Sequence, residues 1–361
     1  KVFAGGSGLK RFPYPLTIAF LQLGLVSACL AFASTVAHVL LPPLSQDDGP
    51  PLQRSWLFGP FFWYKVCHIA PAGLCFGLKY AVTNWGLQLV PIGTRLLLQA
   101  TDLLWTIALA RVINGERISL EEAICACLAT AGTLMISMDA TEALSAPLIP
   151  ILVSLLTPLF LGLSVTTLRW GVKELMRPRG PLGGTMAVAE FTSIKLAISA
   201  LTCLLCACVF ESGCIGLSRH TGLHYSHKPP WWAALAAYPP QGTGLILLAG
   251  VLILVFQVNI PWLPSLTSAV TVGMVGSIKV MPQWLLNDAF GLGRSLTPLS
   301  GVGALLVLAS SCLYLHAQLK QSSGQAAQPH VGILFCGGGG GVDMAPARVE
   351  PCARWGRFAS N

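Results

Sequence analysis

The sequence predicts an all-α, polytopic membrane protein. Of its 361 residues, 54% are hydrophobic and only 10% are charged, whereas a soluble domain carries about 25% charged residues. The mean hydropathy is +0.68. Apolar segments of roughly 20 residues, enough to cross the hydrocarbon core of a bilayer, recur along the chain. These segments are continuous rather than alternating in polarity, which favours helices over a β-barrel.

Nine transmembrane helices can be drawn from these segments. Pro13 and Pro15 suit the start of the first helix, and Pro261 and Pro264 separate the seventh from the eighth. The predicted spans are residues 16–41, 62–88, 91–113, 119–139, 148–169, 184–210, 242–262, 266–287 and 296–318.

The loops between these spans alternate in charge. Residues 111–119 and 169–184 are basic, whereas residues 139–147 contain acids and no base. The positive-inside rule therefore predicts that the two basic loops and the tail after His316 are cytoplasmic. Residues 139–147 and 211–241 are then expected on the opposite side.

The membrane domain is predicted to span residues 1–320. Residues 321–361 have a different composition, rich in glycine, alanine and proline without an apolar period. We predict that this second segment is a disordered tail.

The composition also bears on other classes of function. The net charge of +8 comes from single basic residues and short loops rather than from Lys/Arg runs, so no nucleic-acid partner is expected. Cys203, Cys206 and Cys208 lie in an apolar span with no histidine beside them, which favours helix packing over a metal site. No cofactor is expected. The partners that remain are membrane lipid and a small solute.

Six charged residues fall within the predicted spans and not at their ends, and each costs about 2.5–3.5 kcal/mol at the bilayer centre. Pairing between helices could explain some of them, but bases outnumber acids, so that full pairing still leaves two bases over. This surplus predicts an internal cavity that receives an anion. The six are Lys79, Arg95, Asp102, Glu190, Lys195 and Lys279.

Five motifs, in order along residues 1–320, resemble those of a known family. They are KRFPYPLTIAFLQL (10–23), VTNWGLQLVPIGT (82–94), ARVINGERIS (110–119), LTSAVTVGMVGSIKVMPQWLL (266–286) and GVGALLVLASSCLYLHAQLK (301–320). Together they are similar to the nucleotide-sugar and triose-phosphate translocators of the drug/metabolite transporter superfamily.

The resemblance implies a bundle of ten transmembrane helices, built as two inverted repeats of five. Lys1 would then follow a first helix that is mostly missing, which leaves nine visible. The implied function is an antiporter that exchanges nucleotide sugars or other phosphorylated sugars across an organelle membrane. The Golgi or endoplasmic reticulum is the implied location, with the plastid envelope as an alternative. Whether the protein forms a homodimer is left open.

The resemblance also implies where substrate binds. Lys279 occupies the position of a lysine that meets the anionic substrate in such transporters. Val280 stands where triose-phosphate translocators carry an arginine, and Gln99 stands where a lysine is usual. These departures favour a nucleotide sugar over a triose phosphate. The predicted substrate-binding residues are Lys279, Lys79, Arg95 and Lys195 for charge, with Asn84, Asn259 and Ser277 as hydrogen-bonding groups.

Two other classes of function remain open at this point. A membrane-embedded enzyme would need a cluster of catalytic groups, but His68 stands alone in its span, so no enzyme is expected. A non-transporting regulator derived from the family is compatible with Gln99 and Val280. For Asn84, Asn259 and Ser277, an ordinary role in helix packing is favoured over a role in binding.

Replacing Lys279 by alanine should lower the affinity for a phosphorylated ligand about 10- to 150-fold, because a charge-assisted hydrogen bond is lost. Expression should change little, since the variant also removes the cost of a buried charge. Affinity and thermal stability are measured on the same purified variant. Unchanged affinity with lowered stability would instead make Lys279 a structural partner of Glu190 or Asp102.

Overall fold

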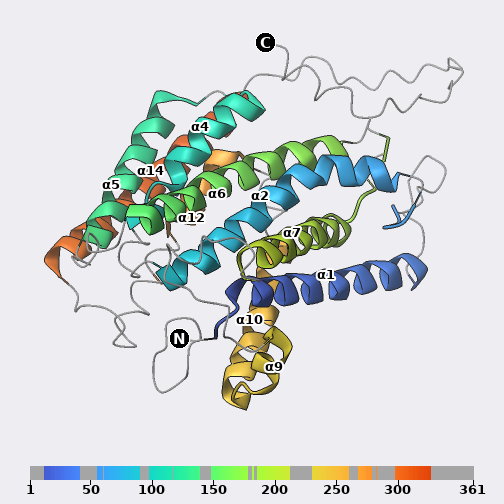
Figure 1. Cartoon of the computed structure of the whole chain (residues 1–361). Coiled ribbons are helices and arrows are strands. Elements are labelled where there is room, and N and C mark those ends of the chain that lie inside the picture. Colours follow the sequence, from blue (N-terminus) through green and yellow to red (C-terminus); the bar gives the residue numbers. More distant parts are fainter. Residues whose placement is uncertain are drawn as a thin grey trace, which may run out of the picture.

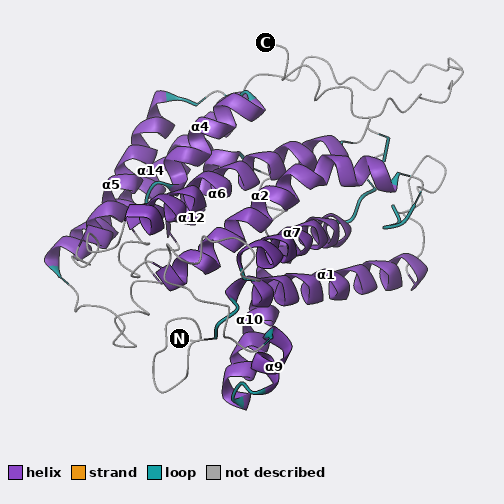
Figure 2. Cartoon of the chain, viewed as in Figure 1, coloured by secondary structure: helices purple, strands orange, loops and turns teal. Residues whose placement is uncertain are grey.

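The structure is a computed structural model. It describes residues 12–40, 55–59, 61–89, 97–116, 118–138, 148–177, 181–182, 185–211, 230–259, 267–278, 282 and 297–326. Within these ranges all regular secondary structure is helical (Figure 2). Seven of the helices are long and apolar enough to cross a membrane. The prediction of an all-α, multi-pass membrane protein is therefore confirmed, whereas the total of nine or ten helices stays a prediction.

The seven span-length helices correspond to seven of the nine predicted spans. They are α1 (Pro15–Leu40), α2 (Phe62–Leu89), α5 (Leu120–Met138), α6 (Leu148–Leu175), α7 (Val188–Phe210), α10 (Pro240–Asn259) and α14 (Pro298–Ala326).

The other two predicted spans are described only in part. They contain the shorter helices α4 (Asp102–Asn114) and α12 (Ala269–Ile278). Residues 90–96 and 279–281, which adjoin these helices in the sequence, lie outside the described ranges. A further short helix, α9 (Trp231–Ala236), lies in a segment that was expected to be a loop.

Helix α6 is longer than the predicted span of 148–169. It continues to Leu175, so that Lys173, expected in a loop, lies on its last turns. Leu168, Val172 and Leu175 keep a helical period and are all buried in the same core cluster. Continued burial of this apolar stripe explains why the helix does not stop where the basic residues begin.

Two groups of helices lie on either side of α6 (Figure 1). Helices α1, α2 and α7 form one group, in which α7 contacts both α1 and α2. Helices α4, α5, α12 and α14 form the other. Helix α6 contacts α2 in the first group and α4 in the second, so it joins the two. Helix α10 packs across α1 and also touches α7.

Glycines allow the closest helix contacts. A Cβ atom added at Gly77 of α2 would lie 2.6 Å from the Cβ of Thr202 on α7. On the far side of the bundle, Gly132 of α5 and Gly303 of α14 face each other, and a Cβ on either would lie 2.6 Å from the carbonyl oxygen of the other. Small residues at such crossings bring helix backbones together, as is typical within membranes.

Side-chain hydrogen bonds join α7 to its neighbours. The Ser27 hydroxyl of α1 donates to the Ser193 carbonyl at 2.8 Å, and the Ser193 hydroxyl donates back to the Ser27 carbonyl at 3.0 Å. On the other side of α7, the Ser199 hydroxyl donates to the Gly73 carbonyl of α2 at 2.8 Å. These bonds fix α7 against α1 and α2.

The start of α1 is capped by a distant carboxylate. Helix α1 begins at Pro15, as the sequence predicts. The Glu211 carboxylate, just after α7, accepts hydrogen bonds from the backbone N–H groups of Leu16 and Thr17 at 2.6 and 3.1 Å. The Thr17 hydroxyl also donates to it, at 2.5 Å. A negative charge at a helix N-terminus is favourable, so this contact links the ends of α1 and α7.

The two basic loops lie at the same end of the bundle. Arg169 of α6 forms an ion pair with Glu116, just after α4, with Nε and Oε1 2.9 Å apart. Arg169 also donates to the carbonyl of Thr267, immediately before α12. The two loops that the charge pattern predicts on one side of the membrane are therefore adjacent in space. Which side faces the cytoplasm stays a prediction.

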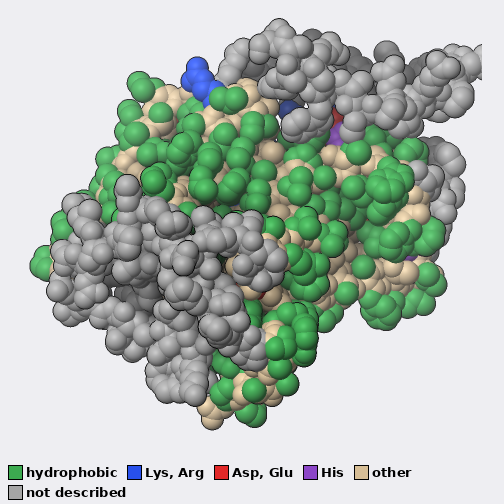
Figure 3. All heavy atoms as spheres, in the orientation of Figure 1, with side chains coloured by type: hydrophobic (Ala, Val, Ile, Leu, Met, Phe, Trp, Pro, Cys, Tyr) green, Lys and Arg blue, Asp and Glu red, His purple; other side chains and the backbone are tan. Residues whose placement is uncertain are grey.

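The outer surface is largely hydrophobic, as Figure 3 shows. Large apolar side chains are exposed along α10, where Leu252 is 62% and Phe256 is 61% exposed. In water such a surface would be an aggregation hazard. It is the surface expected of a protein whose solvent is lipid.

Replacing Gly132 by alanine should destabilise the contact between α5 and α14 by about 1–3 kcal/mol, the usual cost of overpacking. The added methyl group meets backbone atoms, which cannot move aside as a side chain can. Thermal unfolding of the purified protein in detergent measures the change. Gly250→Ala on α10 is the control, because no atom lies within 4 Å of the added Cβ. Equal stability of the two variants would contradict the packing described.

Candidate functional site

A buried ion pair connects the beginnings of α2 and α7. The Lys65 ammonium lies 2.5 Å from Glu190 Oε1, and both side chains are 1% exposed. Lys65 also donates to the Trp56 carbonyl at 2.6 Å, and the Ser55 hydroxyl donates to Glu190 at 3.2 Å. The pair is thus built from α2, α7 and the segment that precedes α2.

This pairing differs from the pairs that the sequence suggests. The sequence suggests Lys279, on another span, as a partner for Glu190, and Lys65 is not among the in-span charges considered. Lys65 lies in the first turns of α2, so it resembles a residue at the membrane surface. Its complete burial follows from the 55–59 segment, whose residues Ser55 and Trp56 contact the same pair.

With Glu190 occupied by Lys65, Lys195 has no acidic partner among the described residues. Its side chain is 1% exposed. The ammonium donates to the Gln257 amide oxygen of α10 at 2.7 Å and lies 4.7 Å from the centroid of the Phe76 ring on α2. An amide oxygen and an aromatic face attract a cation but leave its charge uncompensated.

A second lysine lies near the same ring. The Lys79 ammonium is 5.8 Å from the Phe76 centroid and 4.4 Å from that of Tyr80. Phe76 is buried, whereas Lys79 is partly exposed. We call Lys79, Lys195, Phe76 and Gln257 the basic cluster. It is formed by α2, α7 and α10, and it brings together two of the four lysine and arginine residues predicted to bind substrate.

Of the other predicted site residues, the structure describes only some. Lys279 and Arg95 lie outside the described residues, as does the side chain of Asn259, the last residue of α10. Asn84 lies on α2, partly exposed and one turn beyond Tyr80. The hydroxyl of Ser277 donates to the Gly273 carbonyl of its own helix, α12, at 3.3 Å.

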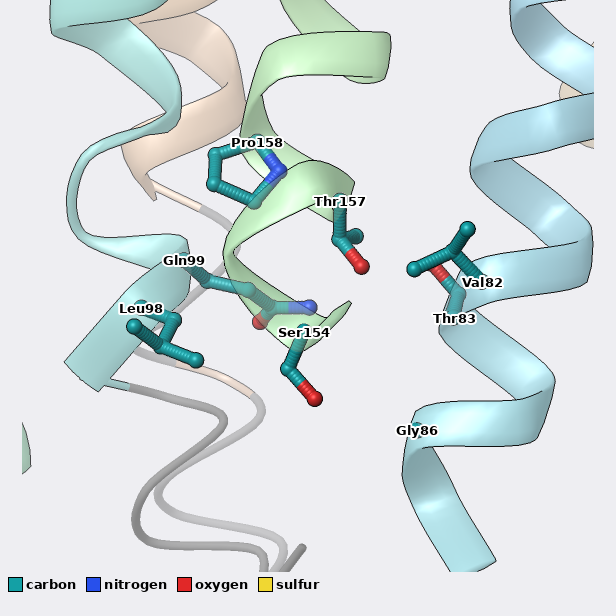
Figure 4. Close-up of a pocket in the computed structure, with 8 residues that line it drawn as sticks. All are labelled: Val82, Thr83, Gly86, Leu98, Gln99, Ser154, Thr157 and Pro158. Atoms are coloured by element: carbon teal, nitrogen blue, oxygen red, sulfur yellow. The ribbon is translucent and has the colours of Figure 1, made fainter. Parts of the chain in front are cut away.

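A small pocket lies between α2, α6 and the short turn before α4 (Figure 4). It is small, with room for about one water-sized group. Three side-chain oxygens at this pocket are buried and have no hydrogen-bond partner among the described residues: Thr83 Oγ1, Gln99 Oε1 and Ser154 Oγ. We call it the hydroxyl pocket. Its lining residues are Val82, Thr83, Gly86, Leu98, Gln99, Ser154, Thr157 and Pro158.

The sequence drew attention to only part of this pocket. Gln99 stood out because the related family usually carries a lysine there, and the structure places its amide at the pocket. Ser154 and Thr157 of α6 were missed. They are three residues apart on one helical face and directly precede Pro158. A polar pair next to a proline inside an apolar span was the available signal.

No metal centre is formed by the residues that the structure describes, where no group of three or more histidine, cysteine, aspartate or glutamate side chains could hold an ion. Cys203, one of the three cysteines on α7, is buried, and its thiol donates to the Gly77 carbonyl of α2 at 3.4 Å. Its role in this structure is to join two helices.

Comparison with known proteins supports a membrane transporter. Residues 7–138 match the model of the EamA-like transporter family. The match covers the first part of the chain, through α5, and includes Lys79, Thr83 and Gln99. It supports the resemblance to drug/metabolite transporters, whereas the nucleotide-sugar and triose-phosphate branch stays a prediction. No curated protein matches the chain.

A solved structure, described only as "Crystal structure of protein", shares the fold. It aligns with a TM-score of 0.50 and 16% sequence identity, over 87% of this chain and 90% of the other. At this identity the similarity concerns the arrangement of the helices alone. It extends well beyond residues 7–138, so the fold is shared by both halves of the bundle.

Replacing Lys65 by methionine should destabilise the protein by about 3–5 kcal/mol, because the Glu190 carboxylate is left buried without its counter-charge. Thermal unfolding in detergent measures the loss. The double variant Lys65→Met/Glu190→Leu should regain most of the stability, since both charges are then absent. A single variant as stable as the wild type would show that the pair is not buried as described.

Proposed function

We propose that the protein is a secondary transporter that exchanges a nucleotide sugar, or another phosphorylated sugar, across an organelle membrane. The match to EamA-like transporters supports the general class. The observation that favours an anionic substrate is Lys195, which is buried at the contact of α2, α7 and α10 without an acidic partner among the described residues.

The proposal depends on the energetic cost of Lys195. A lysine at the bilayer centre costs about 2.5–3.5 kcal/mol on insertion scales. Its hydrogen bond to Gln257 and its contact with the Phe76 ring recover part of this cost. A carboxylate would recover more, yet the nearby carboxylate of α7, Glu190, pairs with Lys65. A phosphate group of a substrate supplies the missing negative charge.

The basic cluster offers two lysines for binding a phosphate group. Lys79 and Lys195 place two ammonium groups around one aromatic ring, and phosphate oxygens form strong charge-assisted hydrogen bonds with such groups. Lys279 and Arg95 are proposed to add positive charge to the same substrate site, on the basis of their positions in the sequence. No covalent step is needed, and the protein is proposed to act as a transporter rather than an enzyme.

The positive charge of the basic cluster also favours the exchange of two anions over the transport of one. If the empty carrier reoriented, the ammonium group of Lys195 would have to move through the low-dielectric interior without a counter-charge, where the cost of an unpaired charge is highest. A bound anion at each crossing removes this cost. Alternating access would rock one half of the bundle against the other around the bound solute, and transport in one direction would be coupled to return of a second anion. By resemblance, we place the protein in the Golgi or endoplasmic reticulum.

Replacing Lys195 by glutamine should lower the affinity for a phosphorylated ligand about 10- to 150-fold, the value of one charge-assisted contact. Stability should stay the same or rise, since a buried charge is removed. Binding of UDP-glucose, GDP-mannose and glucose 6-phosphate to the purified full chain is measured together with thermal unfolding.

Lys173→Gln is the matched control, because Lys173 is exposed at the end of α6. It should leave affinity and stability unchanged. If Lys195→Gln bound these ligands normally and unfolded at a lower temperature, Lys195 would be a structural residue and the case for an anionic substrate would fail.

A further inference from the structure

The hydroxyl pocket contains polar groups that the fold itself does not satisfy. The side chains of Thr83 and Ser154 are 9% and 5% exposed, and their hydroxyl oxygens have no hydrogen-bond partner in the part of the chain that the structure describes. Gln99 Oε1 is buried without a partner at the same place. Buried polar groups in folded proteins are nearly always paired. Three such oxygens around one pocket therefore point to a ligand that supplies their missing hydrogen bonds.

The backbone around the pocket adds to these groups. Pro158 has no N–H to donate to the carbonyl four residues earlier, so the carbonyl of Ser154 loses its helical partner. Gly86 of α2 lies opposite Ser154, and a Cβ at this position would lie only 3.0 Å from Ser154 Oγ. The glycine leaves open the space that a group bound to Ser154 would need.

The pocket's chemistry identifies the kind of group that fits. Its lining residues carry hydroxyl and amide groups between the aliphatic Val82, Leu98 and Pro158, and they include no charged or aromatic side chain. A phosphate would find no positive charge there. A nucleobase would find no ring on which to stack, the contact that favours bases in many sites. Hydroxyl groups both donate and accept hydrogen bonds, and so match these partners.

We propose that the hydroxyl pocket binds one hydroxyl group of the sugar part of the substrate. This inference rests on the proposed function, because it takes the same solute to occupy both sites. Thr83 follows Lys79 by four residues on α2, so the two share a helix face and are separated by about 6 Å along the axis. This separation is within the length of a phosphorylated sugar.

Ligands with and without the sugar separate the two sites. Glucose 6-phosphate and UDP-glucose carry it, whereas inorganic phosphate and UMP do not. Ser154→Ala should weaken binding of glucose 6-phosphate and UDP-glucose about 3- to 10-fold, as expected for one neutral hydrogen bond, and leave phosphate and UMP unchanged. Lys195→Gln should weaken all four. Ser137→Ala is the matched control, because this buried hydroxyl on α5 donates to its own helix, to the Thr133 carbonyl at 2.8 Å.

Gly86→Ala gives a second test that retains every polar group. The added methyl group crowds the space beside Ser154 and should also weaken only the ligands that carry a sugar. Gly250→Ala, with no atom near the added Cβ, is its control and should bind all four ligands normally.

The outcomes distinguish this inference from the proposed function. If Ser154→Ala and Gly86→Ala weaken all four ligands equally, or none, the pocket does not bind the sugar and the inference is wrong. If the wild-type protein binds none of the four but binds free glucose, and both variants weaken glucose, the anionic function fails while the pocket assignment holds. A wild type that binds neither the four ligands nor glucose overturns both.

Discussion

The structure depends on one constraint, which is that the buried polar side chains of α7 must find their partners within the protein, since lipid offers none. Ser193 exchanges hydrogen bonds with Ser27 of α1, and Ser199 donates to a carbonyl of α2. Glu190 meets Lys65 of α2. Lys195 is the exception, because its surroundings among the described residues supply an amide oxygen and an aromatic ring but no negative charge.

Close packing and function are related through this helix. The α7–α2 contact is tight because Gly73 and Gly77 have no side chain to separate the backbones, and interiors packed this closely transmit small displacements. The basic cluster and the hydroxyl pocket lie along the same helix, α2, so a solute held by both would connect α7 and α10 with α6. Binding could thereby bias the relative position of the two groups of helices, which is what alternating access requires.

Much of the fold could be predicted from the sequence, because apolar length is itself the signal for a membrane helix. Pro15 marked the start of α1 correctly, and the alternation of loop charge agrees with the contact between Arg169 and Glu116. The predicted end of α6 was wrong because basic residues were taken as a boundary while the buried stripe continued to Leu175. The functional site was harder to predict from the sequence than the fold. Lys195 could be recognised as a charge inside an apolar span, whereas the Lys65–Glu190 pair joins residues 125 positions apart and the Ser154 pocket requires α2 to meet α6, which no local pattern encodes.

The most direct test of the central claim is counterflow by the wild-type protein in proteoliposomes. Vesicles are loaded with UDP-glucose, GDP-mannose or glucose 6-phosphate, and uptake of the same labelled compounds is compared with uptake of neutral sugars and of organic cations. An anion exchanger should take up phosphorylated sugars when an internal anion is present and should take up none into vesicles loaded with buffer alone. Stimulated uptake of cations, with none of the phosphorylated compounds, would contradict the proposed function.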